Sequence, residues 1–409
     1  MRTTLRSLVV YLAAALLLGA TPAAGQIGGL GGGDFSTTQP TDSTTTGAGW
    51  SITPSLLYSR TWDDNVLLRA PGDETIKDYI NVLNPRGELT YRGRLTDFSA
   101  RYDGAFFMYR QADTLNSYDQ HGGVNARRRL SKRNTLLFSA SAQQSPTTEL
   151  LQFIGVPYIR IGSFSDDVTI GLDTIVNKRL SIVTNGHFDQ ARFDKNQTFA
   201  VLLMGGNSIG GDVGLRERIS AHTTITVDFD ATRATIGAAG DEFDIVHGTA
   251  GVDHQLSEGI HVFAAGGFSR LNVTAFGPSR TGPSWRLGLS DHYRSTFIDL
   301  VYFRSYVPSF GFGGTMQNQE ASASVKMPLT RRLYVQGIVS RRIEDPLVFT
   351  FPELRSTWIQ VSAGYAASTW VRIEGFYAGT RQTAGVPDQL LSHDQIGVQV
   401  IASKPMRIH

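Results

Sequence analysis

The chain contains no cysteine. A protein without cysteine forms no disulfide, binds no metal through thiolates and carries no lipid on an N-terminal cysteine. It also lacks a charge excess, because 38 basic and 36 acidic residues leave a net charge of +2. Composition therefore gives no electrostatic reason to expect a nucleic-acid partner.

Long apolar runs are missing as well, with one exception near the start. The uncharged segment Leu8–Leu18 follows Arg2 and Arg6, and residues 23–25 are small. This order is typical of a secretory signal peptide and predicts cleavage before Gln26. The segment is shorter than the about 20 residues that a membrane helix needs, and no later run reaches that length, so we expect no helical anchor.

Three regions follow from composition. Residues 1–25 are the predicted signal peptide. Residues 26–49 are rich in Gly, Ser and Thr and are expected to form a flexible periplasmic segment. Residues 50–409 show no break in composition and are expected to form a single β-barrel domain.

Most of this region alternates polar and apolar residues with period two, which is the pattern of a strand with two different faces. Soluble sandwiches show the same alternation, so the pattern alone leaves both architectures open. If the strands form a transmembrane barrel, their apolar faces contact lipid and their polar faces line the lumen. The residues then predicted to face lipid are Phe98, Tyr102, Phe106, Val227 and Phe229. Those predicted to line the lumen are Arg101, Asp103, Arg127, Arg129, Asp228, Asp230, Arg286, Arg372 and Glu374.

The lengths of the predicted connections favour the barrel. Short polar connections such as Gly93-Arg94 and Ser131–Asn134 alternate along the chain with longer loops such as Pro71–Asp78 and Ser145–Ser165. Transmembrane barrels have this polarity, with short periplasmic turns and longer extracellular loops. We therefore predict an all-β, antiparallel, up-and-down transmembrane barrel of about 18 strands, with 16 as the alternative.

Tryptophan placement supports the same architecture. All five tryptophans are predicted to lie near strand ends, where the aromatic girdles of a membrane barrel belong. The predicted girdle consists of Trp50, Trp62, Trp285, Trp358 and Trp370. Placement by chance is the competing explanation.

The loop Ser145–Ser165 is the longest and most apolar connection, with Leu150, Phe153 and Ile159 among its residues. Such a loop is unlike a freely solvated surface connection. It either folds inward and constricts the lumen or packs on the rim of the barrel, and the sequence does not decide between these two.

The first hairpin, Tyr58-Ser-Arg-Thr-Trp-Asp-Asp-Asn-Val-Leu-Leu, resembles the opening strand of the β-barrel porin 2 family of outer-membrane proteins. The elbows Arg129-Leu-Ser-Lys-Arg, Gln255-Leu-Ser-Glu-Gly and Pro328-Leu-Thr-Arg-Arg are similar too. This family includes barrels associated with exopolysaccharide biosynthesis and export. The resemblance implies an outer-membrane channel, with polysaccharide as one cargo, and transfers no catalytic residue. One departure is that the sequence ends Ala402-Ser-Lys-Pro-Met-Arg-Ile-His409, without the usual terminal aromatic; a short extension after the final strand would explain it, as would an atypical insertion signal.

Candidate chemistry is sparse, and we predict no catalytic, cofactor or metal site. His247 and His254 are seven positions apart, which places them on opposite faces of one strand and about 23 Å apart. Asp63-Asp64-Asn65 lacks the further acidic positions and the glycine of a calcium loop, so a turn is expected there. His187 and Asp189 share a polar face, but no G-x-S-x-G motif accompanies them.

The sequence therefore favours a channel for hydrophilic solutes in a bacterial outer membrane. Its expected partners are outer-membrane lipids, the barrel-insertion machinery and a hydrophilic solute or polysaccharide. A non-conducting structural or adhesin barrel is the alternative, and a barrel-embedded hydrolase or a soluble secreted β-protein is less favoured.

Overall fold

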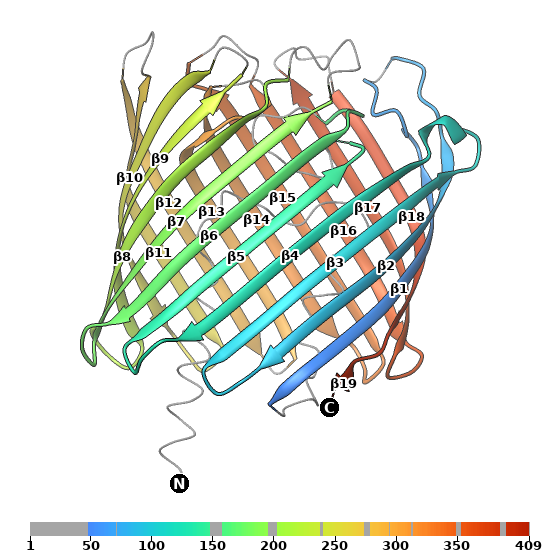
Figure 1. Cartoon of the computed structure of the whole chain (residues 1–409). Helices are drawn as coiled ribbons and strands as arrows, with labels where there is room; N and C mark the ends of the chain where they lie inside the picture. The colour runs from blue at the N-terminus through green and yellow to red at the C-terminus, as the bar shows by residue number, and fades with distance from the viewer. Residues whose placement is uncertain are drawn as a thin grey trace.

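In the computed structural model of the chain, strands form one closed barrel (Figure 1). The structure describes residues 48–70, 72–147, 158–194, 203–237, 240–273, 279–293, 295–311, 314–348, 353–384 and 390–408. The predicted signal peptide and most of the predicted periplasmic segment lie outside these residues. Within them, no helix is long and apolar enough to cross a membrane.

The wall of the barrel consists of eighteen strands within the described ranges, followed by a short nineteenth. They are β1 (Gly49–Asp63), β2 (Asp78–Arg92), β3 (Thr96–Tyr109), β4 (Ser117–Arg129), β5 (Asn134–Ser145), β6 (Ser163–Ile175), β7 (Leu180–Phe193), β8 (Gly206–Arg218), β9 (Thr223–Ile236), β10 (Asp241–Gln255), β11 (Ile260–Val273), β12 (Arg280–Tyr293), β13 (Thr296–Pro308), β14 (Thr315–Pro328), β15 (Leu333–Pro346), β16 (Leu354–Ala366), β17 (Val371–Ala384), β18 (Leu390–Ser403) and β19 (Met406–Ile408). A 3-10 turn, η2 (Asp113–Leu115), lies between β3 and β4.

Each strand pairs antiparallel with the next, and β1 closes the ring against β18. The closing register places Leu57 opposite Ile401 and Trp62 opposite Ile396. After Pro405, which has no N–H to donate, β19 resumes the pairing and places Ile408 opposite Trp50. The predicted up-and-down barrel of about 18 strands is confirmed, and β19 follows the last long strand as a short extension, which was one of the two alternatives.

The two ends of the barrel differ in the length of their connections (Figure 1). At the lower end in that view, connections of two to four residues join β2 to β3, β4 to β5 and so on, at every second step, up to β16 and β17. At the other end, the β5–β6 connection has seventeen residues. Many short turns share one design. In the β4–β5 turn the Ser131 Oγ accepts hydrogen bonds from the backbone N–H groups of Arg133 and Asn134, at 3.1 and 3.0 Å. Asn177, Ser257, Thr330 and Ser368 act in the same way. These caps explain why the sequence elbows resemble one another.

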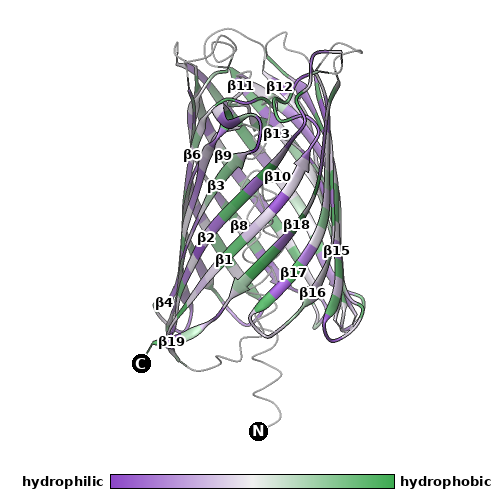
Figure 2. Ribbon diagram, turned by 90° about the vertical axis from the view of Figure 1, so that its right-hand side faces the viewer, coloured by the Kyte–Doolittle hydropathy of each residue, from purple (hydrophilic) through white to green (hydrophobic). Residues whose placement is uncertain are grey.

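Alternation along each strand separates an outward from an inward face, and the ribbons in Figure 2 change repeatedly between hydrophobic and hydrophilic. On β9, Phe229 is 51% exposed on the convex outer surface, while Asp228 and Asp230 point the other way. On β3, Tyr102 and Phe106 are exposed, and Arg101 and Asp103 pair with each other on the inner side. The apolar face is therefore outside, the reverse of a soluble protein.

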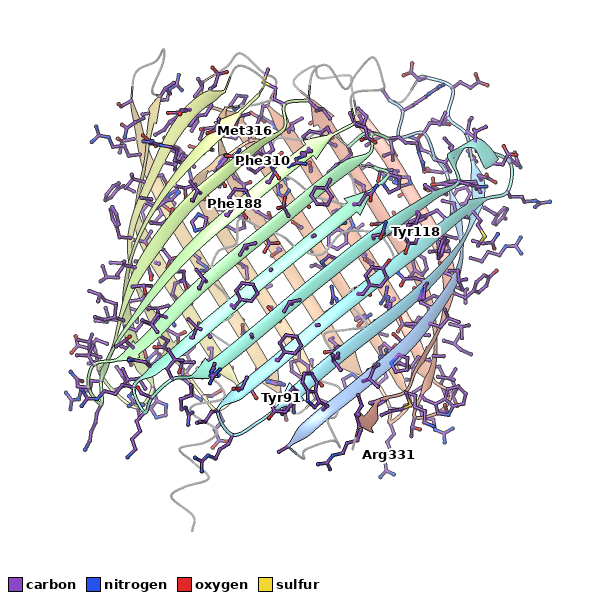
Figure 3. All side chains as sticks on the ribbon, in the orientation of Figure 1. Tyr91, Tyr118, Phe188, Phe310, Met316 and Arg331 are labelled. Carbon is purple, nitrogen blue, oxygen red and sulfur yellow. The ribbon has the colours of Figure 1, made fainter. Side chains whose placement is uncertain are left out.

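Two groups of outward aromatic side chains lie toward opposite ends of the barrel. Near the short turns, Trp50 lies 4.9 Å from Tyr91, measured between ring centroids, and also contacts Phe98. Nearer the long loops, the rings of Phe106 and Tyr118 are 4.4 Å apart. Figure 3 shows Tyr91 low and Tyr118 high on the same wall.

One of the predicted girdle residues is misplaced. Trp358 is only 5% exposed, whereas its neighbours Thr357 and Ile359 are exposed outside, so the indole belongs to the inward face and not to a girdle. The alternation of β16 explains this, since Ile359 and Val361 occupy the outward positions. Trp50, Trp285 and Trp370 are exposed and Trp62 is half-buried at the end of β1; Trp285, however, lies six positions into β12 and not at its start.

Candidate functional site: the barrel lumen

All nine residues predicted to line the lumen lie at inward positions of the register. The first cluster is formed by β2, β3 and β4. Asp103 Oδ1 is 3.2 Å from Arg86 Nε, and its Oδ2 is 2.9 Å from Arg101 Nε and 3.7 Å from His121 Nδ1. One carboxylate therefore holds two guanidinium groups, and Arg101 stays partly accessible to solvent.

Neighbouring strands β6 to β9 carry an acidic surface, which we call the acidic wall. It consists of Asp167, Asp189, Asp212, Asp228 and Asp230. The register places Asp189 opposite Asp167 and Asp230 opposite Asp212. Hydrogen bonds from Ser208 to Asp189 at 3.1 Å and from Asn185 to Asp212 at 2.8 Å hold these carboxylates in place.

Small residues keep the acidic wall thin. At Gly210 an added Cβ would lie 2.5 Å from His187 Nε2 and 2.6 Å from Thr232 Oγ1, so no side chain fits between them. His187 Nε2 lies 3.0 Å from Thr232 Oγ1 as a result. The glycines in this segment thus permit close packing of the wall.

The inner face of β14 and β15 carries a buried ionic group. Arg342 Nε donates to Glu320 Oε2 at 2.9 Å, and its Nη1 lies 3.9 Å from Glu344 Oε1. Ser340 Oγ donates to the other oxygen of Glu320 at 3.0 Å. Burying a charged side chain is costly unless an opposite charge lies close to it. Arg342 provides that opposite charge for the carboxylates of Glu320 and Glu344.

From β15 round to β1 the inner face is mostly uncharged and hydrogen-bonding. Gln382 donates to Ser356 Oγ at 3.0 Å, and Gln399 donates to Glu374 Oε2 at 2.8 Å. The inward amides and hydroxyls of this surface, called the amide wall, include Gln336, Ser340, Ser356, Thr380, Gln382, Gln395, Gln399, Ser59 and Thr61.

The described end of the long β5–β6 connection crosses the mouth of the barrel. Its Tyr158 N–H donates to Gln382 Oε1, an inward side chain of β17, at 2.8 Å. Arg160 Nε donates to the carbonyl of Val66 at 3.0 Å, and its guanidinium stacks over the Tyr109 ring at 5.0 Å. On the other side, Ile161 packs against Leu203 of the β7–β8 connection.

These contacts join strands that are not neighbours in the ring, because the loop continues into β6, whereas Gln382 belongs to β17 and Tyr109 to β3. Tyr158 also packs with Leu68 and Leu391, and it is almost fully buried. The described residues 158–162 thus contact the inward side chain of Gln382 as well as Val66 and Leu68 of the rim, and the choice between constriction and rim packing stays a prediction. Leu150 and Phe153, which contributed to that prediction, lie outside the described residues.

The Asp63-Asp64-Asn65 segment forms a turn that fastens the seam between β1 and β18. Asp63 Oδ1 accepts the Asn65 N–H at 2.9 Å, which confirms the predicted turn. Asp64 Oδ1 accepts the Asp394 N–H at 2.7 Å, and Asn65 Nδ2 donates to the Ser392 carbonyl at 3.1 Å. Among the described residues, no group of three or more His, Cys, Asp or Glu side chains is arranged to hold a metal ion.

One Ser–His–Asp succession exists, and it was missed from the sequence because its members lie on three strands. His247 Nδ1 is 2.8 Å from Ser269 Oγ, and its Nε2 is 3.9 Å from Asp230 Oδ1. Ser269 is fully buried beneath Tyr306, whose N–H points at the same hydroxyl oxygen at 3.4 Å. A substrate cannot reach this hydroxyl, so the group joins the end of β13 to β11. His254 contacts Thr223 at the opposite face of β10, as the odd spacing predicted.

No family model matches the chain, and no curated protein matches it. The resemblance to the β-barrel porin 2 family therefore stays a prediction. Among solved structures, OccAB4 of Acinetobacter baumannii is 7% identical, with 89% of this chain and 100% of that chain covered and a TM-score of 0.47. OccK3 (OpdO) of Pseudomonas aeruginosa is 11% identical, with 87% and 96% covered and a TM-score of 0.46. The siderophore receptor PirA of P. aeruginosa is 10% identical, with 88% and 80% covered and a TM-score of 0.44. Likeness at this level assigns no residue, ligand or activity to the chain.

Proposed function

We propose that the chain is a passive outer-membrane channel for hydrophilic solutes. One observation carries the proposal: the barrel is apolar outside and polar within, and side chains of its inner face retain access to solvent. Arg101, Asp230 and His247 keep side-chain exposures of 30, 26 and 21% although none of them lies on the outer face. Barrels of 16 to 18 strands are wide enough for an aqueous passage.

The outer surface has the properties that a membrane requires. Strands of 12 to 15 residues exceed the about 9 to 11 that a tilted transmembrane strand needs. Because β1 pairs with β18, the first and last long strands do not present open edges, which hydrocarbon would penalise by several kcal/mol for each free polar group. Outer-membrane lipids and the barrel-insertion machinery are the partners that follow from this placement.

The inner surface suggests which solutes pass. The acidic wall disfavours anions, whereas the side chains of the amide wall are mostly buried and hydrogen-bonded within the barrel and leave the choice of solute to the charged groups. We therefore propose neutral or cationic hydrophilic solutes, with uncharged polysaccharide as the polymeric case. Anionic polysaccharide fits the acidic wall poorly.

Planar-bilayer recording tests the channel. The purified protein should produce discrete conductance steps, and the reversal potential in a salt gradient should show a preference for cations. Replacing Asp212, Asp228 and Asp230 together by Asn should move the preference toward anions, because these carboxylates set the potential of the acidic wall. A wild type that inserts into vesicles without ever conducting would overturn the proposal.

A non-conducting structural barrel is the second candidate. The segment 158–162 across the mouth and the buried group around Arg342 favour it, since both reduce the open cross-section. Insertion without conductance, before and after removal of the β5–β6 loop, would support this candidate.

A further inference from the structure

Two inward arginines lie in one register row of the barrel wall. Strands β8 to β12 follow one another round the ring (Figure 1), and their pairings align one inward position from each strand. In order from β8 to β12 these positions are Arg216, Thr226, Gly251, Ala265 and Arg286. The row spans four inter-strand spacings of about 4.8 Å, so at most about 19 Å separates the two arginine Cα atoms. The residues between the arginines have short side chains, which leaves the space between the two guanidinium groups open.

The side chain of Arg286 leans from β12 toward the middle of this row. Its Cζ atom lies 5.5 Å from the centroid of the Phe263 ring on β11. The guanidinium groups of Arg286 and Arg216 are close enough to repel each other electrostatically. Unlike the paired arginines of β3 and β15, neither group forms a hydrogen bond or an ion pair with a described residue. Two facing guanidinium groups without a counter-ion suit an oxyanion, because guanidinium N–H groups bind carboxylate and phosphate oxygens in a fork.

Carboxylates flank the row on both sides. Asp228 lies one inward position nearer the long loops on β9, and Asp253 lies one inward position nearer the short turns on β10. Asp228 interacts electrostatically with both arginines, and Asp253 interacts with Arg216. Gly214 makes room for the first carboxylate, because an added Cβ there would lie 2.6 Å from Asp228 Oδ1. The wall therefore presents a positive subsite with negative charge above and below it.

The charges of this row favour a solute that carries both signs. Its arginines and the two flanking carboxylates are half-buried, so a solute in the lumen can reach them. A simple anion would be repelled by the carboxylates, and a simple cation would be repelled by the arginines. A zwitterion satisfies both groups and, having no net charge, is not excluded by the acidic wall.

We propose that β8 to β12 bind a small zwitterionic solute, with its anionic group between Arg216 and Arg286 and its cationic group beside Asp228. Asp228 is the carboxylate that acts on both arginines, so it lies nearest to the space between them. The site rests on the proposed channel and names one class among its neutral solutes.

Single-channel recording in planar bilayers tests the site with three probes of the same chain length. The probe γ-aminobutyrate carries both charges, whereas butyrate and butylammonium carry one charge each. In the wild type, γ-aminobutyrate should interrupt the ion current at concentrations about tenfold or more below those of the other two probes. The reason is that each charge-assisted hydrogen bond contributes about tenfold or more to affinity.

Arg286→Gln and Arg216→Gln each test the positive subsite. Either change should weaken the block by γ-aminobutyrate and by butyrate about tenfold or more, because one of the two guanidinium groups is lost. Block by butylammonium should not weaken. Asp228→Asn should give the complementary pattern, with weaker block by γ-aminobutyrate and butylammonium and no weaker block by butyrate.

Lys326→Gln is the matched control for the arginine variants. It removes one positive charge from the inner face of β14, where both register partners of Lys326 are uncharged. The control should keep the preference for γ-aminobutyrate over the other two probes. Heat-modifiable migration on unboiled gels shows which variants are folded, and either arginine variant is sufficient for the comparison.

Equal weakening in Arg286→Gln and Lys326→Gln would overturn the proposal, and so would block by butyrate as strong as that by γ-aminobutyrate. A wild type that conducts without any block by γ-aminobutyrate would overturn the site and leave the channel standing. A wild type that never conducts would count against the channel instead. Titration calorimetry of the folded barrel in detergent would then decide the site, because binding of γ-aminobutyrate supports it and absence of binding overturns it.

Discussion

The carboxylate of Asp63 lies 2.8 Å from His393 Nε2, although 330 positions separate the two residues in the chain. The first and last long strands thus meet through a side-chain contact as well as a backbone ladder. Gln395 Nε2 donates to the same carboxylate oxygen at 2.9 Å, and both members of the pair are buried. A barrel closes only when the two strands that are farthest apart in the sequence pair with each other. The Asp63–His393 contact therefore stabilises the pairing that has the largest loop-closure cost.

Asp63→Ala should destabilise the barrel by about 3 kcal/mol, since it leaves donors on buried His393, on partly buried Gln395 and on the Asn65 backbone without their acceptor. The measurement is the urea midpoint for loss of heat-modifiable migration in vesicles. Asp113→Ala, at an exposed residue of η2, is the matched control and should change the midpoint little. Equal midpoints for the two variants would show that the seam is held by its backbone pairing alone.

Phe229→Arg should reduce the fraction of folded barrel in vesicles. The side chain is exposed on the outer face near the middle of β9, where a charge in hydrocarbon costs about 2–4 kcal/mol. Asp228→Arg, at the next position, should be tolerated because it faces the lumen. Similar losses in both variants would mean that the two faces have been assigned the wrong way round.

The alternation and the turns were predictable because both are local. A period of two places Asp228 and Phe229 on opposite faces whatever their neighbours are, and the Ser131 cap needs only the backbone two and three positions later. Trp358 could have been assigned correctly by the same rule, from Ile359 and Val361 beside it. Proximity to a strand end was the weaker criterion, and it misplaced the residue.

The site depends instead on contacts between distant segments. Nothing in the local pattern links Asp63 with His393 or Tyr158 with Gln382, because these pairs form only when the ring closes. The contact of Tyr306 on β13 with Ser269 on β11 likewise joins strands that are not neighbours in the sheet. A sequence with period two contains no signal for such contacts.

Arg342→Met should cost about 3–5 kcal/mol, because it leaves the buried carboxylate of Glu320 without its cation. Removing both charges in Glu320→Gln/Arg342→Met should restore most of this stability, since an apolar or neutral pair of similar volume avoids the desolvation cost. A double-mutant cycle of urea unfolding measures the coupling. Additive losses would show that the two side chains do not stabilise each other.

Replacing residues 146–162 by a short Gly-Ser turn should raise the single-channel conductance while leaving the wall intact. Ser145 and Ser163 are direct partners in the β5–β6 ladder, so a two-residue turn can join them without changing the register. The deletion removes the segment that ties Gln382, Val66 and Tyr109, along the neighbouring strands β17 to β3, to the start of β6. Arg160→Ala, which removes only the contacts with Val66 and Tyr109, should give a smaller rise and noisier open levels. An unchanged conductance in both variants would show that the loop lies beside the path of the solute and not across it, whereas conductance that appears only after the deletion would identify the loop as the plug.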